Sequence, residues 1–373
     1  MPVSRLLWQL RSLQKLTHCR LHRRGATGVS VKILVVKLSS LGDVVHAMPA
    51  VQDLRREFPG MELDWVVERA FASLVQRCAG VGHVIACDLR RWRSAPLGRE
   101  TRQEWKAFKT ELQAQSYDAI LDLQGLTKSA LVSWLARTTP QGRRYGLANQ
   151  TQGSAFETPA RWVADVAIRL EPRVHAVQRS RLLCAQALGY PLPQTLDYGL
   201  LPGALAAVPQ PPIGVSVNPF VPRKPFVVLV HGTTREDKQW PVESWIEIGQ
   251  RLNHAGFSVA LAHGNATEKA TSEAIAQRLQ DAWVWPSMGL DALADTMARS
   301  AGVVGVDSGL SHIAVALGLP HVQIYNFDTA WRTGPQNADA QATHQLSVTG
   351  SPCPDVDVVW SAWERLNTLV LCR

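Results

Sequence analysis

The sequence contains no apolar run that approaches the roughly 18 residues of a membrane-spanning helix. Its six cysteines are widely spaced and include no Cys-x-x-Cys pair, which argues against a disulfide framework and a zinc site. The loops after the predicted strands contain no His-x-x-x-His or Asp-x-Asp motif, and the three-glycine dinucleotide fingerprint is missing. These absences predict a protein of the reducing cytoplasm that uses no metal.

The length and the charge narrow the class further. A chain of 373 residues predicts two domains of under 200 residues each, and 46% hydrophobic against 19% charged residues is typical of a globular protein. Of the net charge of +8, six positive charges lie within the first 30 residues, which contain no acid. The rest is too weakly basic to bind a nucleic-acid duplex, so we expect an anionic membrane surface or an anionic substrate instead.

Residues 1–30 form a basic extension with two interpretations. Five leucines recur among the basic residues at near-helical spacing, which predicts an amphipathic helix on a membrane surface. The segment lacks the apolar stretch and cleavage site of a secretory signal. Alternatively, translation begins near Val31, where the globular pattern starts. The sequence favours neither interpretation.

From Val31 onward, short apolar runs alternate with helical patterns. The predicted strands of this half are 31–36, 63–67, 83–86 and 119–122, and its predicted helices include 44–58, 100–115 and 127–136. Pro49 kinks the first of these helices or marks its first turn. This alternation predicts the α/β class with a doubly wound parallel sheet.

A proline-rich stretch, 191–225, holds 9 of the 22 prolines and separates the first half from a second. The second half has predicted strands at 226–230, 259–262, 303–306 and, as the last one, 321–325, with helices at 314–319 and 358–371. We therefore predict an extension (1–30), an acceptor domain (31–190), a linker (191–225), a donor domain (226–352) and a C-terminal helix (353–373). Open α/β sheets bind ligands beyond the carboxyl ends of their strands, so the loops there should form the site, in a cleft between the halves.

The loop that follows the first strand, KLSSLGD (37–43), places a carboxylate, Asp43, at the start of a helix. Aspartate is a common N-cap, and capping competes with catalysis for the same oxygens. The local sequence alone favours the cap. His46, one turn further, is a candidate second base, although a structural role is the stronger expectation.

Two loops of the second half have the composition of an anion site. In HGTTREDKQWP (231–241), Thr233, Thr234 and Lys238 at a strand–helix junction supply donors and a counter-charge for a phosphate, where the alternative is a solvated polar loop. In GVDSGLSH (305–312), small residues bring backbone amides to a helix start. Asp307 there binds a ribose or sugar hydroxyl or caps the helix, and His312 is structural unless it faces the cleft.

Positive charge also gathers in the first half. Arg90, Arg91 and Arg93 surround Trp92, and arginine forks suit carboxylates and phosphates, although such a run is usually a solvated face. Lys128, at the strand–helix corner YDAILDLQGLTKS, adds to this positive field.

Six segments then occur together in order: KLSSLGDVVHAMPA, LDWVVE, RRWRSA, YDAILDLQGLTKSA, HGTTREDKQWP and GVDSGLSH. Together they resemble the lipopolysaccharide heptosyltransferases, which are inverting glycosyltransferases of the GT-B fold with two Rossmann-like domains. The similarity covers nearly everything from Val31 to the terminal helix. RRWR and the long lysine loop resemble the type I enzymes, which add the first heptose to Kdo-lipid A, whereas type II enzymes usually carry a shorter lysine loop.

The resemblance implies two catalytic residues. Asp43 matches the general base, which takes a proton from a Kdo hydroxyl as that oxygen attacks the anomeric carbon of ADP-L-glycero-β-D-manno-heptose, and ADP leaves with inversion. Lys238 matches the residue that stabilises developing charge on the diphosphate. No cofactor is implied, and the enzyme is expected on the cytoplasmic face of the inner membrane as a peripheral protein.

The resemblance also implies two sets of binding residues. The donor set is Ser39, Ser40, Thr233, Thr234, Lys238, Glu268, Met288, Asp307, Ser308, Gly309 and His312, with Ser308 where threonine is usual. The set for the anionic acceptor is Arg90, Arg91, Arg93 and Lys128. Two features depart from the family: the N-terminal extension has no counterpart, and 325–335 (YNFDTAWRTGP) lacks the usual Gly-Pro-Thr-Asp-Pro run, so no donor contact is expected there.

Three alternatives remain open at this point. A heptosyltransferase of the same family with another acceptor sugar would share every motif. A non-catalytic nucleotide- or lipid A-binding protein would need no base at Asp43. A nicotinamide-dependent oxidoreductase fits paired Rossmann halves, but the missing glycine fingerprint argues against it.

Overall fold

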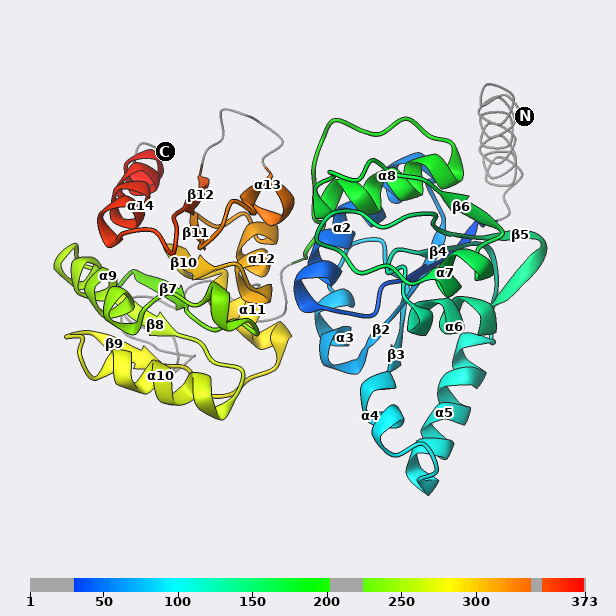
Figure 1. Cartoon of the computed structure of the whole chain (residues 1–373), viewed down its shortest axis with the longest axis horizontal. Coiled ribbons are helices and arrows are strands. Elements are labelled where there is room, and N and C mark those ends of the chain that lie inside the picture. The colour runs from blue at the N-terminus through cyan, green and yellow to red at the C-terminus, as the bar shows by residue number, and fades with distance from the viewer. Residues whose placement is uncertain (1–29, 202–223, 337–343, 372–373) are drawn as a thin grey trace. The chain divides into compact units, whose positions relative to one another are not determined.

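The computed structural model describes residues 30–201, 224–336 and 344–371 (Figure 1). The predicted extension therefore lies outside the described residues except for Ser30, as does most of the predicted linker, whose boundaries stay a prediction. The chain divides after Gly199 into two compact units. Within the described ranges, no helix is long and apolar enough to cross a membrane.

The first unit is built on a six-stranded parallel sheet of order β3-β2-β1-β4-β5-β6. Its strands are β1 (Lys32–Val36), β2 (Glu62–Glu68), β3 (His83–Cys87), β4 (Ser116–Asp122), β5 (Arg137–Leu147) and β6 (Val166–Ile168). Its helices are α2 (Leu41–Glu57), α3 (Ala72–Val75), α4 (Leu89–Ser94), α5 (Arg99–Leu112), α6 (Thr127–Leu135), α7 (Thr158–Val163) and α8 (Ala176–Leu188), with a 3-10 turn η1 (Arg69–Phe71).

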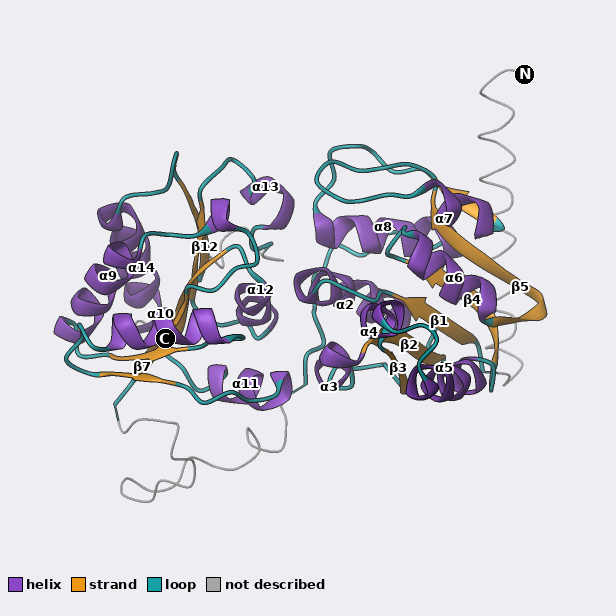
Figure 2. Cartoon of the chain, turned by 60° about the horizontal axis from the view of Figure 1, so that its bottom comes forward, coloured by secondary structure: helices purple, strands orange, loops and turns teal. Residues whose placement is uncertain are grey.

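Strand β1 is apolar throughout its last four residues because helices cover both faces of the sheet (Figure 2). Leu34 and Val36 pack on the side of α5 and α6, where Phe108 and Val132 belong to the same buried cluster. On the other side, α2 packs against α8. The Arg181 guanidinium on α8 forms a bidentate pair with Asp53 on α2, at 2.6 and 3.0 Å, and both side chains are buried. This pair fixes α8 against α2.

The second unit repeats the architecture with a parallel sheet of order β12-β11-β10-β7-β8-β9. Its strands are β7 (Phe226–Val230), β8 (Ser258–Leu261), β9 (Ala282–Val284), β10 (Gly302–Val306), β11 (His321–Tyr325) and β12 (Gln345–Thr349). Its helices are α9 (Val242–His254), α10 (Ala266–Ala276), α11 (Leu290–Met297), α12 (Gly309–Ala316), α13 (Ala330–Thr333) and α14 (Val356–Leu371), with a 3-10 turn η2 (Glu236–Lys238). One core cluster joins residues of β7, β10 and β11 to Trp245 of α9 and Trp363 of α14.

Several expectations for the strands and helices differ from the structure. The strand at 321–325 is not the last one, because β12 follows it as an edge strand whose polar and apolar residues alternate in place of a continuous apolar run. The helix expected at 314–319 begins five residues earlier, at Gly309. Strand β5 starts with a polar segment, so its composition gave no strand signal. Pro49 lies inside α2 and does not mark its start.

Both sheets reverse their strand order at one strand. In the first unit β1 pairs with β2 on one side and with β4 on the other, and in the second unit β7 pairs likewise with β8 and β10. The loops that leave the carboxyl ends of β1 and β4, or of β7 and β10, therefore meet at this switch point, where open α/β sheets bind ligands. The motifs that contain Asp43, Lys128, Lys238 and Asp307 lie on these loops, whereas RRWR follows β3.

Candidate active site

The loop after β1 places Asp43 at the third residue of helix α2. The N-cap is Ser40, so the expectation that Asp43 itself caps the helix is wrong. Instead the Asp43 carboxylate accepts hydrogen bonds from the backbone N–H of Ser40, at 3.3 Å, and from its hydroxyl, at 3.1 Å. This capping-box arrangement uses Oδ2 and leaves Oδ1 for other partners.

Two cations hold the other oxygen of Asp43. Lys37 Nζ lies 3.4 Å from Oδ1, and Arg179 Nη2, from helix α8, lies 3.2 Å from the same atom. Lys37 is only 1% exposed and also donates to the carbonyl of Leu123, whereas 34% of the Asp43 side chain is exposed. The carboxylate is thus the accessible member of a buried ionic cluster.

These charges decide the protonation of the cluster. Burial alone would raise the pKa of Asp43, but Lys37, Arg179 and His46 together hold it well below its usual range. Burial lowers the pKa of Lys37 to about 8, with Arg179 adding to the effect and Asp43 opposing it. Asp43 is therefore ionised throughout the physiological pH range. His46 is buried with its ring edge-on to His175, so it does not act as an exposed base.

The loop after β4 secures the loop that carries Asp43. The Gln124 side-chain oxygen accepts hydrogen bonds from the backbone N–H groups of Leu38 and Ser39, at 3.1 and 3.2 Å. Lys128, in the first turn of α6, donates to the Ser39 hydroxyl at 2.7 Å. The structure thus brings three predicted residues, Ser39, Asp43 and Lys128, to one edge of the first sheet.

The predicted arginines lie on the short helix α4. Arg90, Arg91 and Arg93 are exposed, while Trp92 between them is buried and donates from Nε1 to Glu104 at 2.6 Å. Arg91 forms ion pairs with Glu104 and, at 3.4 Å, with Asp88. The buried tryptophan therefore anchors a turn that presents three guanidinium groups to solvent.

In the second unit, the loops after β7 and β10 meet through an ion pair. Lys238 Nζ lies 2.5 Å from Asp307 Oδ2, and His312 Nε2 lies 3.3 Å from Oδ1. Burial would raise the pKa of Asp307, but His312 and Lys238 outweigh it and lower this pKa below its usual range. Asp307 is only 4% exposed and Lys238 is 18% exposed, so the lysine is the accessible member here.

The backbone around Lys238 is held by a residue that the sequence did not single out. The Asn326 side-chain amide, directly after β11, donates to the carbonyl of Asp237 at 3.0 Å and to that of Gln239 at 2.8 Å. These carbonyls flank Lys238 on both sides. Asn326 lies within 325–335, the segment from which we expected no donor contact, and it acts there on the lysine loop.

The other predicted donor residues lie around the same edge of the second sheet. Glu268, near the N-terminus of α10, accepts a hydrogen bond from the backbone N–H of Gly264 at 2.6 Å. A Cβ at Gly232 would lie 2.7 Å from the Glu268 carboxyl carbon, so a larger residue there would require the Glu268 side chain to move. Ser308 is the N-cap of α12, which starts at Gly309. Thr233 and Met288 are half-buried and Thr234 is exposed, all three on loops that follow strands.

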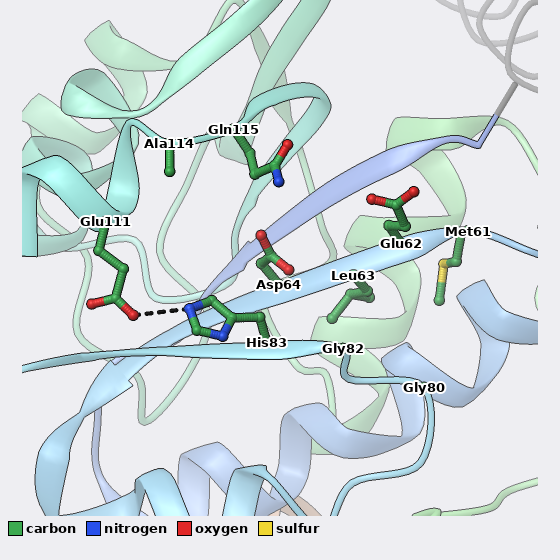
Figure 3. Close-up of a pocket in the computed structure, with 10 residues that line it drawn as sticks. All are labelled: Met61, Glu62, Leu63, Asp64, Gly80, Gly82, His83, Glu111, Ala114 and Gln115. Atoms are coloured by element: carbon green, nitrogen blue, oxygen red, sulfur yellow. Dashed lines mark hydrogen bonds and ion pairs between the residues drawn. The ribbon is translucent and has the colours of Figure 1, made fainter.

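A separate cavity of about 460 Å³ lies at the opposite edge of the first sheet (Figure 3). It is lined by residues at the amino ends of β2 and β3, and its polar side chains already have partners: Asp64 accepts from the Tyr117 hydroxyl at 2.7 Å, and His83 lies 2.8 Å from Glu111. None of the predicted site residues lines it. Within the described ranges, no three His, Cys, Asp or Glu side chains come together as a metal site would require.

Comparison with known proteins places this arrangement in a family. The sequence pattern of glycosyltransferase family 9 (heptosyltransferase) matches residues 105–357. Lipopolysaccharide heptosyltransferase 1 of Escherichia coli (strain K12) is 37% identical over 297 residues, which is 79% of this chain and 88% of that protein. The chain belongs to glycosyltransferase family 9.

Solved structures agree with this assignment. The structure of E. coli heptosyltransferase WaaC with ADP has a TM-score of 0.74 at 32% identity and covers 91% of this chain and 99% of that chain. The structure of the same enzyme with ADP-2-deoxy-2-fluoro heptose has a TM-score of 0.69 over the same shares. The predicted heptosyltransferase family and the GT-B fold are therefore confirmed.

The site of this family 9 chain also contains Lys37, Arg179 and Asn326, which the sequence did not predict as members. Lys37 stands in the quoted loop motif, but its position gave no sign that it is buried against Asp43. Arg179 lies 136 residues from Asp43, on a helix with many buried positions, and an arginine in such a pattern is the signal that was available. Asn326 directly follows a predicted strand, where polar residues of the site were expected.

Proposed function

We propose that this protein transfers L-glycero-D-manno-heptose from ADP-heptose to the Kdo sugar of Kdo-lipid A, with inversion at the anomeric carbon. The observation that carries the proposal is Asp43: an ionised, one-third-exposed carboxylate at the carboxyl edge of the first sheet, in a chain of family 9. A carboxylate there suits the removal of a proton from an acceptor hydroxyl.

The cations around Asp43 shape how it would act. They keep it ionised but also weaken it as a base, since a carboxylate with a low pKa holds a proton poorly. Proton removal would therefore accompany attack on the anomeric carbon, because the acceptor oxygen becomes more acidic as its bond to carbon forms. Capping by Ser40 and ion pairing by Lys37 and Arg179 fix the carboxylate in one orientation, which general-base catalysis requires.

The second unit supplies the features that a sugar diphosphate donor needs. Lys238, partly exposed, would neutralise the charge that develops on the leaving ADP. Helix α12 directs its N-terminal amides toward the same edge of the sheet, with Ser308 at the N-cap, which suits an anion. The bound ADP and fluorinated ADP-heptose in the structures of WaaC support this donor.

The acceptor assignment rests on charge and resemblance. Arg90, Arg93 and Lys128 offer positive charge in the first unit, as an anionic acceptor such as Kdo-lipid A requires. A lipid-linked acceptor in turn implies that the enzyme works as a peripheral protein at the cytoplasmic face of the inner membrane. The heptosyltransferase 1 relative supports this acceptor.

The test is an assay for ADP release by the purified full-length protein. We expect turnover with ADP-heptose and truncated Kdo-lipid A, and none with ADP-glucose as donor. A product linkage that retains the β configuration would contradict the inverting mechanism. Turnover that requires an acceptor already carrying heptose would instead identify a related enzyme with another acceptor sugar.

A further inference from the structure

Two tryptophans of the first unit expose most of their surface. Trp134 is 63% exposed and Trp162 is 76% exposed, although tryptophan is the side chain that gains most from burial. Trp134 lies on α6, one turn after Leu131, which is 42% exposed. Trp162 lies on α7, which packs against α6 (Figure 1). We call Leu131, Trp134 and Trp162 the tryptophan patch.

Positive charge accompanies the tryptophan patch. Arg161 directly precedes Trp162, and Arg137 follows Trp134 by three residues; both are exposed, and no described residue forms a salt bridge with either. The two acids nearest to Arg161 in sequence are engaged elsewhere. Glu157 accepts a hydrogen bond from the backbone N–H of Thr127 at 2.7 Å, and Asp165 accepts one from that of Arg144 at 2.8 Å.

The tryptophan patch and the candidate site share helix α6. Lys128 in its first turn contacts Ser39 beside the Asp43 loop, and Trp134 lies six residues further along. At a helical rise of 1.5 Å per residue, about 9 Å of helix separates the two positions. Trp134 is therefore within two helical turns of Lys128, one of the residues that we assign to the acceptor.

We propose that the tryptophan patch, with Arg137 and Arg161, docks on a bilayer that contains anionic phospholipids. Tryptophan rings are amphipathic and settle at the level of lipid headgroups, and arginines beside them are attracted to anionic headgroups. The inference rests on the proposed function, because a lipid-linked acceptor lies at such a surface. Docking through α6 would bring Lys128 and the Asp43 loop to the headgroup layer, where the acceptor sugar is.

The experiment measures binding of the full-length protein to vesicles of phosphatidylcholine with and without 30% phosphatidylglycerol, by co-sedimentation. We expect the apparent Kd for the anionic vesicles to rise at least tenfold in the variant Trp134→Ser/Trp162→Ser and in Arg137→Glu/Arg161→Glu. Two controls match these changes elsewhere on the surface. Phe327→Ser/Val358→Ser removes exposed apolar side chains, and Lys106→Glu/Lys109→Glu reverses exposed charges on α5; each should shift the Kd less than twofold.

Two outcomes would overturn the inference. One is vesicle binding by the patch variants that equals that of the unchanged protein. The other is a dimer of the unchanged protein, seen by sedimentation velocity, that the tryptophan variant abolishes without any change in vesicle binding; the patch would then contact a second copy of the chain.

A second measurement separates this inference from the proposed function. The tryptophan variant should transfer heptose to a water-soluble, deacylated Kdo acceptor at the unchanged rate, but transfer more slowly to Kdo-lipid A in anionic vesicles. If the unchanged protein transfers heptose to neither acceptor, the proposed function is wrong, whereas its vesicle binding still tests the patch. Equal loss with both acceptors would show that the tryptophan variant disturbs the site, which overturns the proposed docking role.

Discussion

The switch points of the two units carry the same kind of cluster in opposite arrangements. In the first unit Asp43 is held by Lys37 and Arg179, and in the second Asp307 is held by Lys238 and His312. In the first cluster the acid is the more exposed side chain: 34% of Asp43 is exposed, against 1% of Lys37. In the second cluster it is the lysine: 18% of the Lys238 side chain is exposed, against 4% of Asp307.

This difference distinguishes side chains that can contact a substrate from the buried side chains that hold them in position. A side chain can touch a substrate only where it is exposed, so the first cluster offers a carboxylate and the second an ammonium group. The buried partner in each cluster fixes the orientation and charge of the exposed one. Asp307 is therefore better placed to position Lys238 than to bind a ribose or sugar hydroxyl, one of the two roles that its loop suggested.

The largest effect should come from removing the exposed carboxylate. Asp43→Asn keeps the shape but cannot accept a proton, so we expect kcat to fall by about 10²–10⁴-fold, the usual contribution of a general base. Binding of ADP, measured by calorimetry, should be unchanged, because Lys238 and its neighbours remain. Full turnover by this variant would contradict the assignment of Asp43 as the general base. A thermal melt tests whether the variant is destabilised because Lys37 and Arg179 are left unpaired.

The corresponding experiment in the second unit removes the exposed lysine. Lys238→Met deletes the charge that neutralises the leaving diphosphate, and we expect kcat to fall by about 10²–10³-fold. Asp307→Asn should lower kcat less and leave the KM for the donor unchanged, because it acts through Lys238. A large increase in that KM for Asp307→Asn, with kcat preserved, would restore Asp307 to direct donor binding.

The positions of Asp43 and Lys238 were predictable from the sequence because each lies in a short motif after an apolar strand. The sequence did not predict which member of each ion pair is exposed. Lys37 donates to the carbonyl of Leu123, which follows β4, and Asp43 pairs with Arg179 of α8; both partners come from far along the chain. Strand β5 was not predicted for a related reason. Its polar first residues follow no periodic pattern, so they are a strand only because neighbouring elements hold them in the sheet.

The cations around Asp43 should be visible in the pH dependence of the reaction. Arg179→Gln removes a positive charge that lowers the pKa of Asp43, so this pKa should rise. The acid limb of kcat/KM, where Asp43 becomes protonated and inactive as the pH falls, should then move to higher pH. Arg169→Gln, an exposed arginine of the same unit, is the control. An unmoved limb would mean that Arg179 does not set the charge of Asp43.

The smallest effect should come from Asn326, which touches neither ion of its cluster. Asn326→Ala removes two hydrogen bonds from the backbone on either side of Lys238, each contributing about 1 kcal/mol. We expect kcat to fall about five- to tenfold with little change in the KM of the acceptor, since a loosened lysine loop stabilises the leaving diphosphate less well. Asn253→Ala is a demanding control in another part of the same unit, because this side chain donates to two carbonyls, both at 3.0 Å, and also accepts from the backbone N–H groups of Gln280 and Asp281, both at 3.1 Å. If Asn253→Ala, which should lose more stability, loses as much activity as Asn326→Ala, Asn326 serves the fold alone. A loss of activity confined to Asn326→Ala would show that Lys238 depends on the backbone of its loop. Asp43 depends in the same way on its buried partners, Lys37 and Arg179.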